Sequence, residues 1–357
     1  MHGARVRDAP VALAVPEPSD HNHGPRASRC RRAATGALPE RSMFAIPRTR
    51  HFPSLGPSGF HRVAYTEWGS SHNPHVVICV HGLTRNSRDF DYLAARLASS
   101  CRVVCMDVAG RGRSDWLPDK SDYGFALYQS EAAALLAHVM ARSGGVLAWL
   151  AGLLQRLGRP ERIDWVGTSM GGMIGMILAA KAGSPVGRLV LNDVGPLVPW
   201  SGLVRLKNVN AGLNAKFKDL GEAEQHLRAA CAAFGPLSDR KWRHVTRHSV
   251  RRNDDGTYSL AYDPGIVSAI RRGNHGDIEF GGDFLQGVDL WPVWEQSKCP
   301  TLVLRGAESD MLLEATAKQM TERGPRARLV EFPGIGHAPW LMTEDQIGVV
   351  RDFLLAR

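Results

Sequence analysis

The sequence lacks several features that would place it in a specialised class of protein. No apolar run reaches the ~18 residues that a membrane-spanning helix needs, and the longest candidate is Val146 to Leu154. The six cysteines form no CxxC pair, and glycine follows no G-X-Y period, which excludes a collagen chain and disfavours a metal site or a disulfide framework. The first residues also lack the sustained apolar core of a secretory signal. We therefore expect a soluble cytoplasmic protein with reduced cysteines and no membrane partner.

The sequence also lacks a strongly basic folded region, although its formal net charge is +9. Residues 1–57 carry +5, residues 58–195 carry +3, residues 196–285 carry +3 and residues 286–357 carry −2. More than half of the excess thus lies in a short tail, so a basic nucleic-acid-binding domain is poorly supported and no nucleic-acid partner is expected.

The remaining chain alternates between short apolar runs and helical stretches. Residues 1–50 are rich in Pro, Arg, Ala and His without periodicity, which predicts a disordered N-terminal extension. The expected strands are 60–68, 76–80, 102–108, 163–166, 189–191, 301–304 and 329–332. The expected helices are 88–98, 126–157 with a break at 143–145, 170–182, 313–323 and 345–356. This alternation predicts an α/β fold with a mostly parallel central sheet and helices on both faces.

One segment interrupts the alternation. Residues 196–285 contain no strong strand signal and are too long for a loop inside a compact domain. They predict an inserted, mostly helical lid with a turn at 253–256. The core is then divided into residues 58–195 and residues 286–357.

A nucleophile is predicted where the strand over 163–166 ends. Gly167-Thr168-Ser169-Met170-Gly171 fits G-x-S-x-G between a strand and a helix. In that context the serine occupies a tight turn that exposes its hydroxyl above the sheet, at the positive end of the following helix. Ser169 is therefore the candidate nucleophile, against the alternative of a glycine-rich packing turn.

A serine hydroxyl needs a base, and the base needs a carboxylate. His337 lies after the last strand, at the sheet edge that also carries Ser169, and is the candidate base. We favour Asp310 as the acid because it follows the penultimate strand and gives the chain order Ser, Asp, His. Asp193, at the end of the strand over 189–191, is the alternative acid.

The third requirement is a pair of donors for a developing oxyanion. The backbone N–H groups of Leu83, after the first parallel strand, and of Met170, after the nucleophile, are the candidates. His81 is expected to shape this loop rather than to act as a base. Arg85 could equally contact a polar substrate or brace the loop.

Together these residues resemble the α/β-hydrolase superfamily, in its lid-bearing serine-esterase-like branch, over residues 58–357. The resemblance is carried by His81-Gly82, by Asp107 with Gly110-Arg111-Gly112-Arg113-Ser114, and by the positions of Ser169, Asp310 and Gly336-His337. It implies the α/β-hydrolase fold and a carboxylic-ester hydrolase acting on small or medium acyl substrates. A serine at position 169 argues against the dehalogenase and epoxide-hydrolase branches.

The expected reaction is hydrolysis of a carboxylic ester through an acyl-enzyme. Acyl transfer, carbon–carbon bond hydrolysis and a perhydrolase reaction use the same three residues and stay open, as does a non-catalytic receptor. The +3 charge of the lid suggests an anionic acyl substrate. No cofactor and no metal are expected: His244 and His248 could share a helix face, but no third ligand follows them in the sequence. The oligomeric state is left open.

Overall fold

The computed structural model describes residues 46–141, 160–199, 215–266 and 288–356. The chain divides into two units, residues 1–42 and residues 43–357, and the described residues all belong to the second. The strand β1 begins at Arg48, so the last three residues of the segment predicted to be disordered, residues 48–50, lie in a strand. Residues 1–45 of that predicted extension lie outside the described residues.

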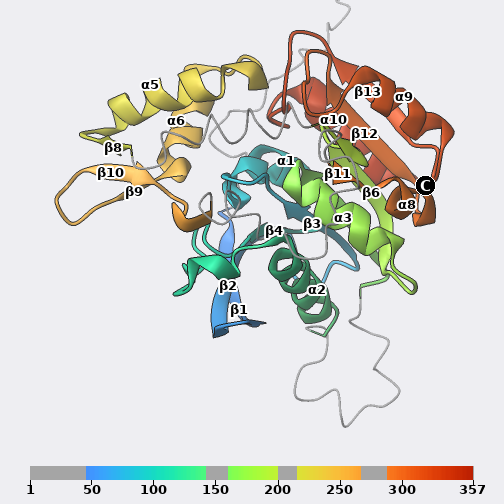
Figure 1. Cartoon of the computed structure of the whole chain (residues 1–357), viewed down its shortest axis with the longest axis horizontal. Helices are drawn as coiled ribbons and strands as arrows, with labels where there is room; N and C mark the ends of the chain where they lie inside the picture. Colours follow the sequence, from blue (N-terminus) through green and yellow to red (C-terminus); the bar gives the residue numbers. More distant parts are fainter. Residues whose placement is uncertain (1–45, 142–159, 200–214, 267–287, 357) are drawn as a thin grey trace, which may run out of the picture. The chain divides into compact units, whose positions relative to one another are not determined.

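The second unit is built on an eight-stranded sheet with the order β1-β2-β4-β3-β5-β6-β12-β13 (Figure 1). β1 pairs antiparallel with β2, and β2 pairs antiparallel with β4, whereas all the other pairings in this sheet are parallel. The strands are β1 (Arg48–Gly56), β2 (Gly59–Trp68), β3 (His75–Val80), β4 (Arg102–Asp107), β5 (Arg162–Thr168), β6 (Val186–Asn192), β12 (Thr301–Gly306) and β13 (Arg328–Phe332). The prediction of a mostly parallel sheet is confirmed.

The parallel strands are apolar because both faces of the sheet are covered. In β3, Val76, Ile78 and Val80 pack into one hydrophobic cluster. Val77 and Cys79, which point to the opposite face, pack into the other. Alternate residues of a strand point to opposite faces, so a strand that is buried on both sides becomes a continuous apolar run.

Helices form the two outer layers. α2 and α3 contact each other on one face, together with α8, and α1 contacts α10 on the other. Their bounds are η2 (Ser87–Phe90, a 3-10 helix), α1 (Asp91–Leu97), η3 (Lys120–Asp122, a 3-10 helix), α2 (Phe125–Ala141), α3 (Met170–Ala180), α8 (Trp291–Gln296), α9 (Glu314–Glu322) and α10 (Glu344–Leu355). The predicted continuation of α2 to residue 157, with its break at 143–145, lies outside the described residues.

The insertion is more than a helical lid. It contains helices α5 (Leu220–Ala230) and α6 (Asp239–Ser249), which Figure 1 shows beside the β9–β10 hairpin. The three-stranded sheet β8-β10-β9 was not expected from the sequence; its strands are β8 (Lys216–Phe217), β9 (Val250–Arg252) and β10 (Tyr258–Leu260). The turn predicted at 253–256 connects β9 to β10.

A pair of two-residue strands lies where the insertion leaves the core and where it returns. β7 (Leu197–Val198) pairs with β11 (Val288–Asp289), so the two ends of the insertion leave the core side by side. Within the described ranges, no helix is both long and apolar enough to cross a bilayer. The five cysteines in these ranges are all free thiols.

Candidate active site

Ser169 lies on a sharp turn between β5 and α3. Its backbone has a φ of 52°, in the left-handed region that residues other than glycine rarely adopt. The two flanking glycines make this turn possible because the backbones meet without side chains between them. A Cβ on Gly167 would lie 2.3 Å from the carbonyl oxygen of Gly171, and a Cβ on Gly171 would lie 2.0 Å from that of Val80. The G-x-S-x-G pattern thus reflects close packing of the turn against the end of β3.

A continuous chain of hydrogen bonds leads from Ser169 into the protein. Nε2 of His337 lies 3.0 Å from Oγ of Ser169, and Nδ1 of the same ring lies 2.8 Å from Oδ2 of Asp193. His337 and Asp193 are both buried. The geometry is that of a nucleophile, a base and an orienting carboxylate.

The carboxylate that the structure places 2.8 Å from Nδ1 of His337 is that of Asp193, the alternative acid, rather than that of the preferred Asp310. The reason is the strand order: β6 lies between β5 and β12, so a residue at the end of β6 faces both the serine turn and the loop after β12. The loop after β12 contributes Ser309 instead, whose Oγ donates to Oδ2 of Asp193 over 2.6 Å. Asp193 is thus the aspartate that lies between the histidine ring and the loop after β12.

Asp193 is held through both its side chain and its backbone. Its Oδ1 accepts a 2.8 Å hydrogen bond from the N–H of Gly306, and its own N–H donates to the carbonyl of Leu304 over 2.8 Å. Its φ of 58° is again in the left-handed region. Such backbone strain persists where surrounding contacts fix it, which is typical of functional sites.

The loop after β3 lies against the nucleophile. A Cβ on Gly82 would lie only 3.6 Å from Cβ of Ser169. Nδ1 of His81 lies 2.7 Å from the carbonyl of Gly82, while Nε2 accepts a 3.1 Å hydrogen bond from the N–H of Val108. His81 must therefore be neutral with its proton on Nδ1, and its complete burial lowers its pKa to about 3. It supports the loop and is not placed to act as a base.

Arg111 holds the same loop through its guanidinium. Its guanidinium is fully buried and donates from Nε to the carbonyl of Leu83 over 2.8 Å and from Nη1 to the carbonyl of Ala109 over 2.7 Å. The guanidinium carbon also lies 4.5 Å from the ring centre of Tyr128. The loop that carries Leu83 is thus fixed by His81 on one side and by Arg111 on the other.

A pocket opens beside Ser169 and His337, between the core and the insertion. Its walls combine the loop after β3 with apolar and polar side chains of the insertion; the lining residues are Gly82, Leu83, Thr84, Arg85, Thr168, Ser169, His226, Leu227, Ala230, Cys231, Phe234, Ser249, Leu260, Tyr262, His337 and Ala338. Burial raises the pKa of Tyr262 to about 12 and also raises that of the Cys231 thiol. Both groups are therefore neutral at physiological pH.

Arg85 lies on the pocket wall and is held there by an ion pair. It lines the pocket and also forms a bidentate ion pair with Asp89, from Nε over 2.8 Å and from Nη2 over 2.5 Å. Burial alone would lower the pKa of its guanidinium, but Asp89 raises it above its ordinary value. Nearby, Trp242 of the insertion packs against Trp340 with ring centres 5.6 Å apart.

Two supporting residues escaped the sequence analysis. Asn192 accepts a hydrogen bond from the N–H of Ser169 on its carbonyl, and its side-chain Nδ2 donates to Oγ1 of Thr168 and to the carbonyl of Pro339. It therefore joins the serine turn to the histidine loop. Ser309 is the other. The only available signal was position, since both residues follow strands at the edge where Ser169 lies.

The comparisons with known proteins agree with this fold. Residues 77–351 match the model of the alpha/beta hydrolase family, so the chain belongs to that family. It is an enzyme of the hydrolase class, as its sequence predicted.

Two curated relatives and one solved structure are similar to this chain over most of its length. The chain is 38% identical over 314 residues to a 3-hydroxybutyrate-oligomer hydrolase of Cupriavidus necator, covering 87% of this chain and 99% of that one. It is 27% identical over 272 residues to an esterase of Mycobacterium tuberculosis, covering 76% of this chain and 78% of that one. Among solved structures, an alpha/beta hydrolase from Novosphingobium aromaticivorans superposes with a TM-score of 0.70 at 31% identity, covering 87% of this chain and 99% of that one.

Proposed function

We propose that this protein hydrolyses carboxylic esters through an acyl-enzyme, with Ser169 as nucleophile, His337 as base and Asp193 as the orienting acid. The observation that carries the proposal is the chain of hydrogen bonds from Ser169 Oγ through the His337 ring to Asp193. This arrangement lets a weakly acidic hydroxyl lose its proton at the moment of attack.

The reaction has two halves. His337 accepts the proton of Ser169 as Oγ attacks the ester carbonyl carbon, and then donates it to the departing alcohol. A water molecule, deprotonated by the same ring, attacks the acyl-enzyme and releases the acid. Asp193 keeps the His337 proton on Nδ1 and stabilises the imidazolium that forms in each half.

The oxyanion would be stabilised by the backbone N–H groups of Leu83 and Met170. The carbonyl of Gly82 is held by His81 and by the N–H of Arg85, so the trans peptide directs the Leu83 N–H to the opposite side. Met170 begins α3, where unpaired N–H groups and the helix dipole favour negative charge. Donors fixed in advance can contribute about 3 to 4 kcal/mol to such a transition state.

For the substrate we propose short oligomers of a hydroxy acid, joined by esters and ending in a carboxylate. This rests on the 38% identity to the 3-hydroxybutyrate-oligomer hydrolase along nearly all of that protein. Arg85 on the pocket wall adds the cation that a terminal carboxylate would favour. Arg85 would thus add to the preference for anionic substrates that the positive charge of the insertion suggests.

The test is turnover of purified 3-hydroxybutyrate dimer and trimer, with the products separated by chromatography. We expect release of free 3-hydroxybutyrate, and Ser169→Ala should lower the rate by about 10⁶-fold. Ser99→Ala, which changes an exposed serine after α1, is the matched control and should not change the rate. Unchanged turnover by Ser169→Ala would refute the mechanism.

The products also separate hydrolysis from the alternative reactions of the same triad. Release of the free acid with or without an added alcohol or thiol supports hydrolysis, whereas an acceptor-dependent ester or thioester would indicate acyl transfer. Cleavage of a vinylogous diketone would indicate carbon–carbon bond hydrolysis. Equal specificity constants for a dimer and its methyl ester at low salt would remove the anionic preference.

A further inference from the structure

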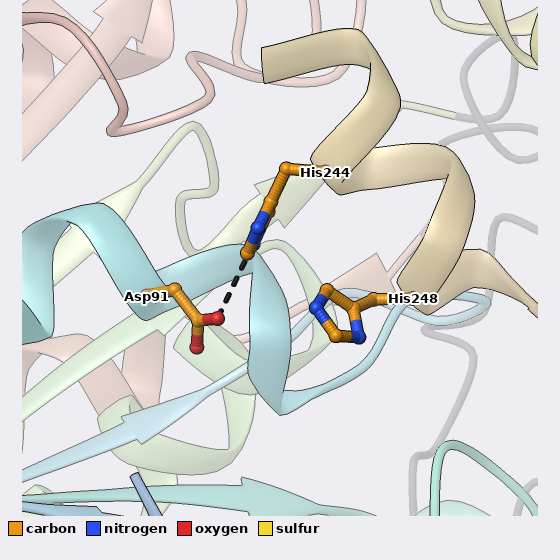
Figure 2. A group of neighbouring side chains, drawn as sticks. All are labelled: Asp91, His244 and His248. Carbon is orange, nitrogen blue, oxygen red and sulfur yellow. Dashed lines mark ion pairs between the residues drawn. The ribbon is translucent and has the colours of Figure 1, made fainter. Parts of the chain in front are cut away.

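A second polar cluster lies where the insertion packs on the core, outside the catalytic triad. Figure 2 shows the side chains of His244 and His248, one turn apart on α6, directed toward Asp91 at the start of α1. One potential ligand atom from each of the three residues lies within 4.8 Å of the other two. The fold thus supplies the third ligand that the sequence around the histidines does not contain.

The three side chains are already in mutual contact. Nε2 of His244 lies 3.2 Å from Oδ2 of Asp91, and the two imidazole rings lie 4.6 Å apart at an angle of 66°. Asp91 is fully buried, and both histidines are partly buried. This burial and mutual contact distinguish the cluster from exposed acidic groups that lie near one another on a surface.

A positive charge occupies this cluster. Nε and Nη2 of Arg88 donate to the carboxylate of Asp91 over 2.5 to 2.9 Å, and its Nη1 lies 3.4 Å from Nδ1 of His248. The guanidinium therefore sits between the same groups that would surround a metal ion. It neutralises the buried carboxylate in the free protein, and any ion that binds must displace it.

We propose that Asp91, His244 and His248 form a binding site for a divalent transition-metal ion such as Zn²⁺, which replaces the Arg88 side chain and joins α6 to α1. Two imidazoles four residues apart on a helix and one carboxylate form a common Zn²⁺ ligand set, with water completing the coordination. Imidazole ligands favour Zn²⁺, Cu²⁺ and Ni²⁺ over Mg²⁺ and Ca²⁺. The inference is independent of the proposed ester hydrolysis.

The position gives the ion a structural effect on the pocket. Ser249, which follows His248, lines the pocket, as does Arg85 three residues before Arg88. The carbonyl of His248 already accepts a 2.8 Å hydrogen bond from Nδ2 of Asn86. A bound ion would therefore strengthen an existing attachment between the pocket wall on the insertion and the loop before α1.

The test is Zn²⁺ titration by calorimetry on the full chain without an affinity tag, with Co²⁺ absorption as a second readout. We expect one Zn²⁺ per chain in the wild type and a loss of that site in the His244→Ala,His248→Ala double variant. His72→Ala removes an exposed histidine and serves as the matched control, which should bind as the wild type does. Arg88→Gln, which removes the competing cation, should bind Zn²⁺ at least several-fold more tightly.

Two results would overturn the site. One is a wild type that takes up no Zn²⁺, and the other is a double variant that binds as the wild type does. If the double variant fails to fold, as judged by circular dichroism, Arg88→Gln decides the matter. An affinity that is unchanged or weaker in Arg88→Gln would then contradict the proposal.

Discussion

The carboxylate of Asp193 makes three hydrogen bonds, to the N–H of Gly306, the hydroxyl of Ser309 and the ring of His337. These bonds fix the orientation of the Asp193 side chain before the His337 ring is protonated. At the scale of single residues, the Asp193 side chain is therefore held in advance by the end of β12 and by the loops after β12 and β13. Such fixed donors cost no reorganisation during the reaction.

This geometry predicts a sharp difference between two aspartates. Asp193→Asn should lower kcat by about 10⁴-fold, because the amide cannot stabilise the imidazolium and favours the wrong tautomer. Asp310→Asn should lower kcat by no more than about tenfold, since Nδ1 of the His337 ring is already paired with Asp193. Steady-state kinetics of both variants on one ester measure this difference in kcat. A larger loss of kcat in Asp310→Asn than in Asp193→Asn would indicate that Asp310 is the acid.

The sequence could single out Ser169 and His337, which the structure places in contact, but not the aspartate that contacts the ring. A glycine-flanked serine between a strand and a helix is a local pattern, and so is a histidine after the last strand. The choice between Asp193 and Asp310 depends on which strand lies beside β6, which is a long-range property. The same reason explains why Ser309 and Asn192 were missed.

At the scale of elements, a buried glutamate connects the antiparallel strands β1, β2 and β4. Glu67 on β2 accepts 3.0 Å hydrogen bonds from Arg48 of β1 and from Arg102 of β4. Burial alone would raise the pKa of Glu67, but Arg102 and the arginines of β1 lower it below its ordinary value. The ion pairs thus connect three strands where the sheet turns from parallel to antiparallel.

Glu67→Gln should destabilise the protein by about 3 to 5 kcal/mol at pH 7, because it leaves Arg102 buried without its counter-charge. A carboxyl with a lowered folded-state pKa stabilises above its unfolded pKa, and this contribution is lost as the pH falls through the folded value. The difference between wild type and variant in urea unfolding should therefore shrink at acid pH. A difference that stays constant from pH 7 to acid would argue against the charge as its cause.

The serine turn predicts a second effect on an element. Gly171→Ala would place a Cβ 2.0 Å from the Val80 carbonyl, so α3 must move away from β3 at a cost of more than about 2 kcal/mol. Gly348→Ala is the matched control, since a Cβ there meets nothing within 4 Å on helix α10. It should stabilise the protein by about 0.5 to 1 kcal/mol. Thermal unfolding measures both, and equal effects would show that the close approach at Gly171 is not limiting.

At the scale of the whole molecule, the fold followed from the alternation of apolar strands and helices, because strands buried on both faces leave a continuous signature. The small sheet between β6 and β12 was not predicted, since β8, β9 and β10 are two or three residues long. Such short strands have no periodicity to detect. The metal-ligand cluster could not be predicted either, since Asp91 lies 153 residues before His244. The cytoplasmic location stays a prediction.

The described residues of the candidate site all belong to the second unit of the chain, residues 43–357. A chain that begins at Met43 should therefore keep its kcat/KM for a short ester within about twofold of the full-length value. Side-by-side kinetics of the two purified chains test this. A large loss of turnover, with unfolding midpoints unchanged, would show that residues 1–42 contribute to the site.

The central claim is that Ser169 becomes covalently acylated, and labelling tests it most directly. The purified protein is treated with a fluorophosphonate and digested, and the modified peptide is sequenced by mass spectrometry. We predict a single adduct on Ser169 in the wild type, slower labelling in Asp193→Asn and no adduct in Ser169→Ala. Labelling at another residue, or equal labelling of Ser169→Ala, would contradict the account.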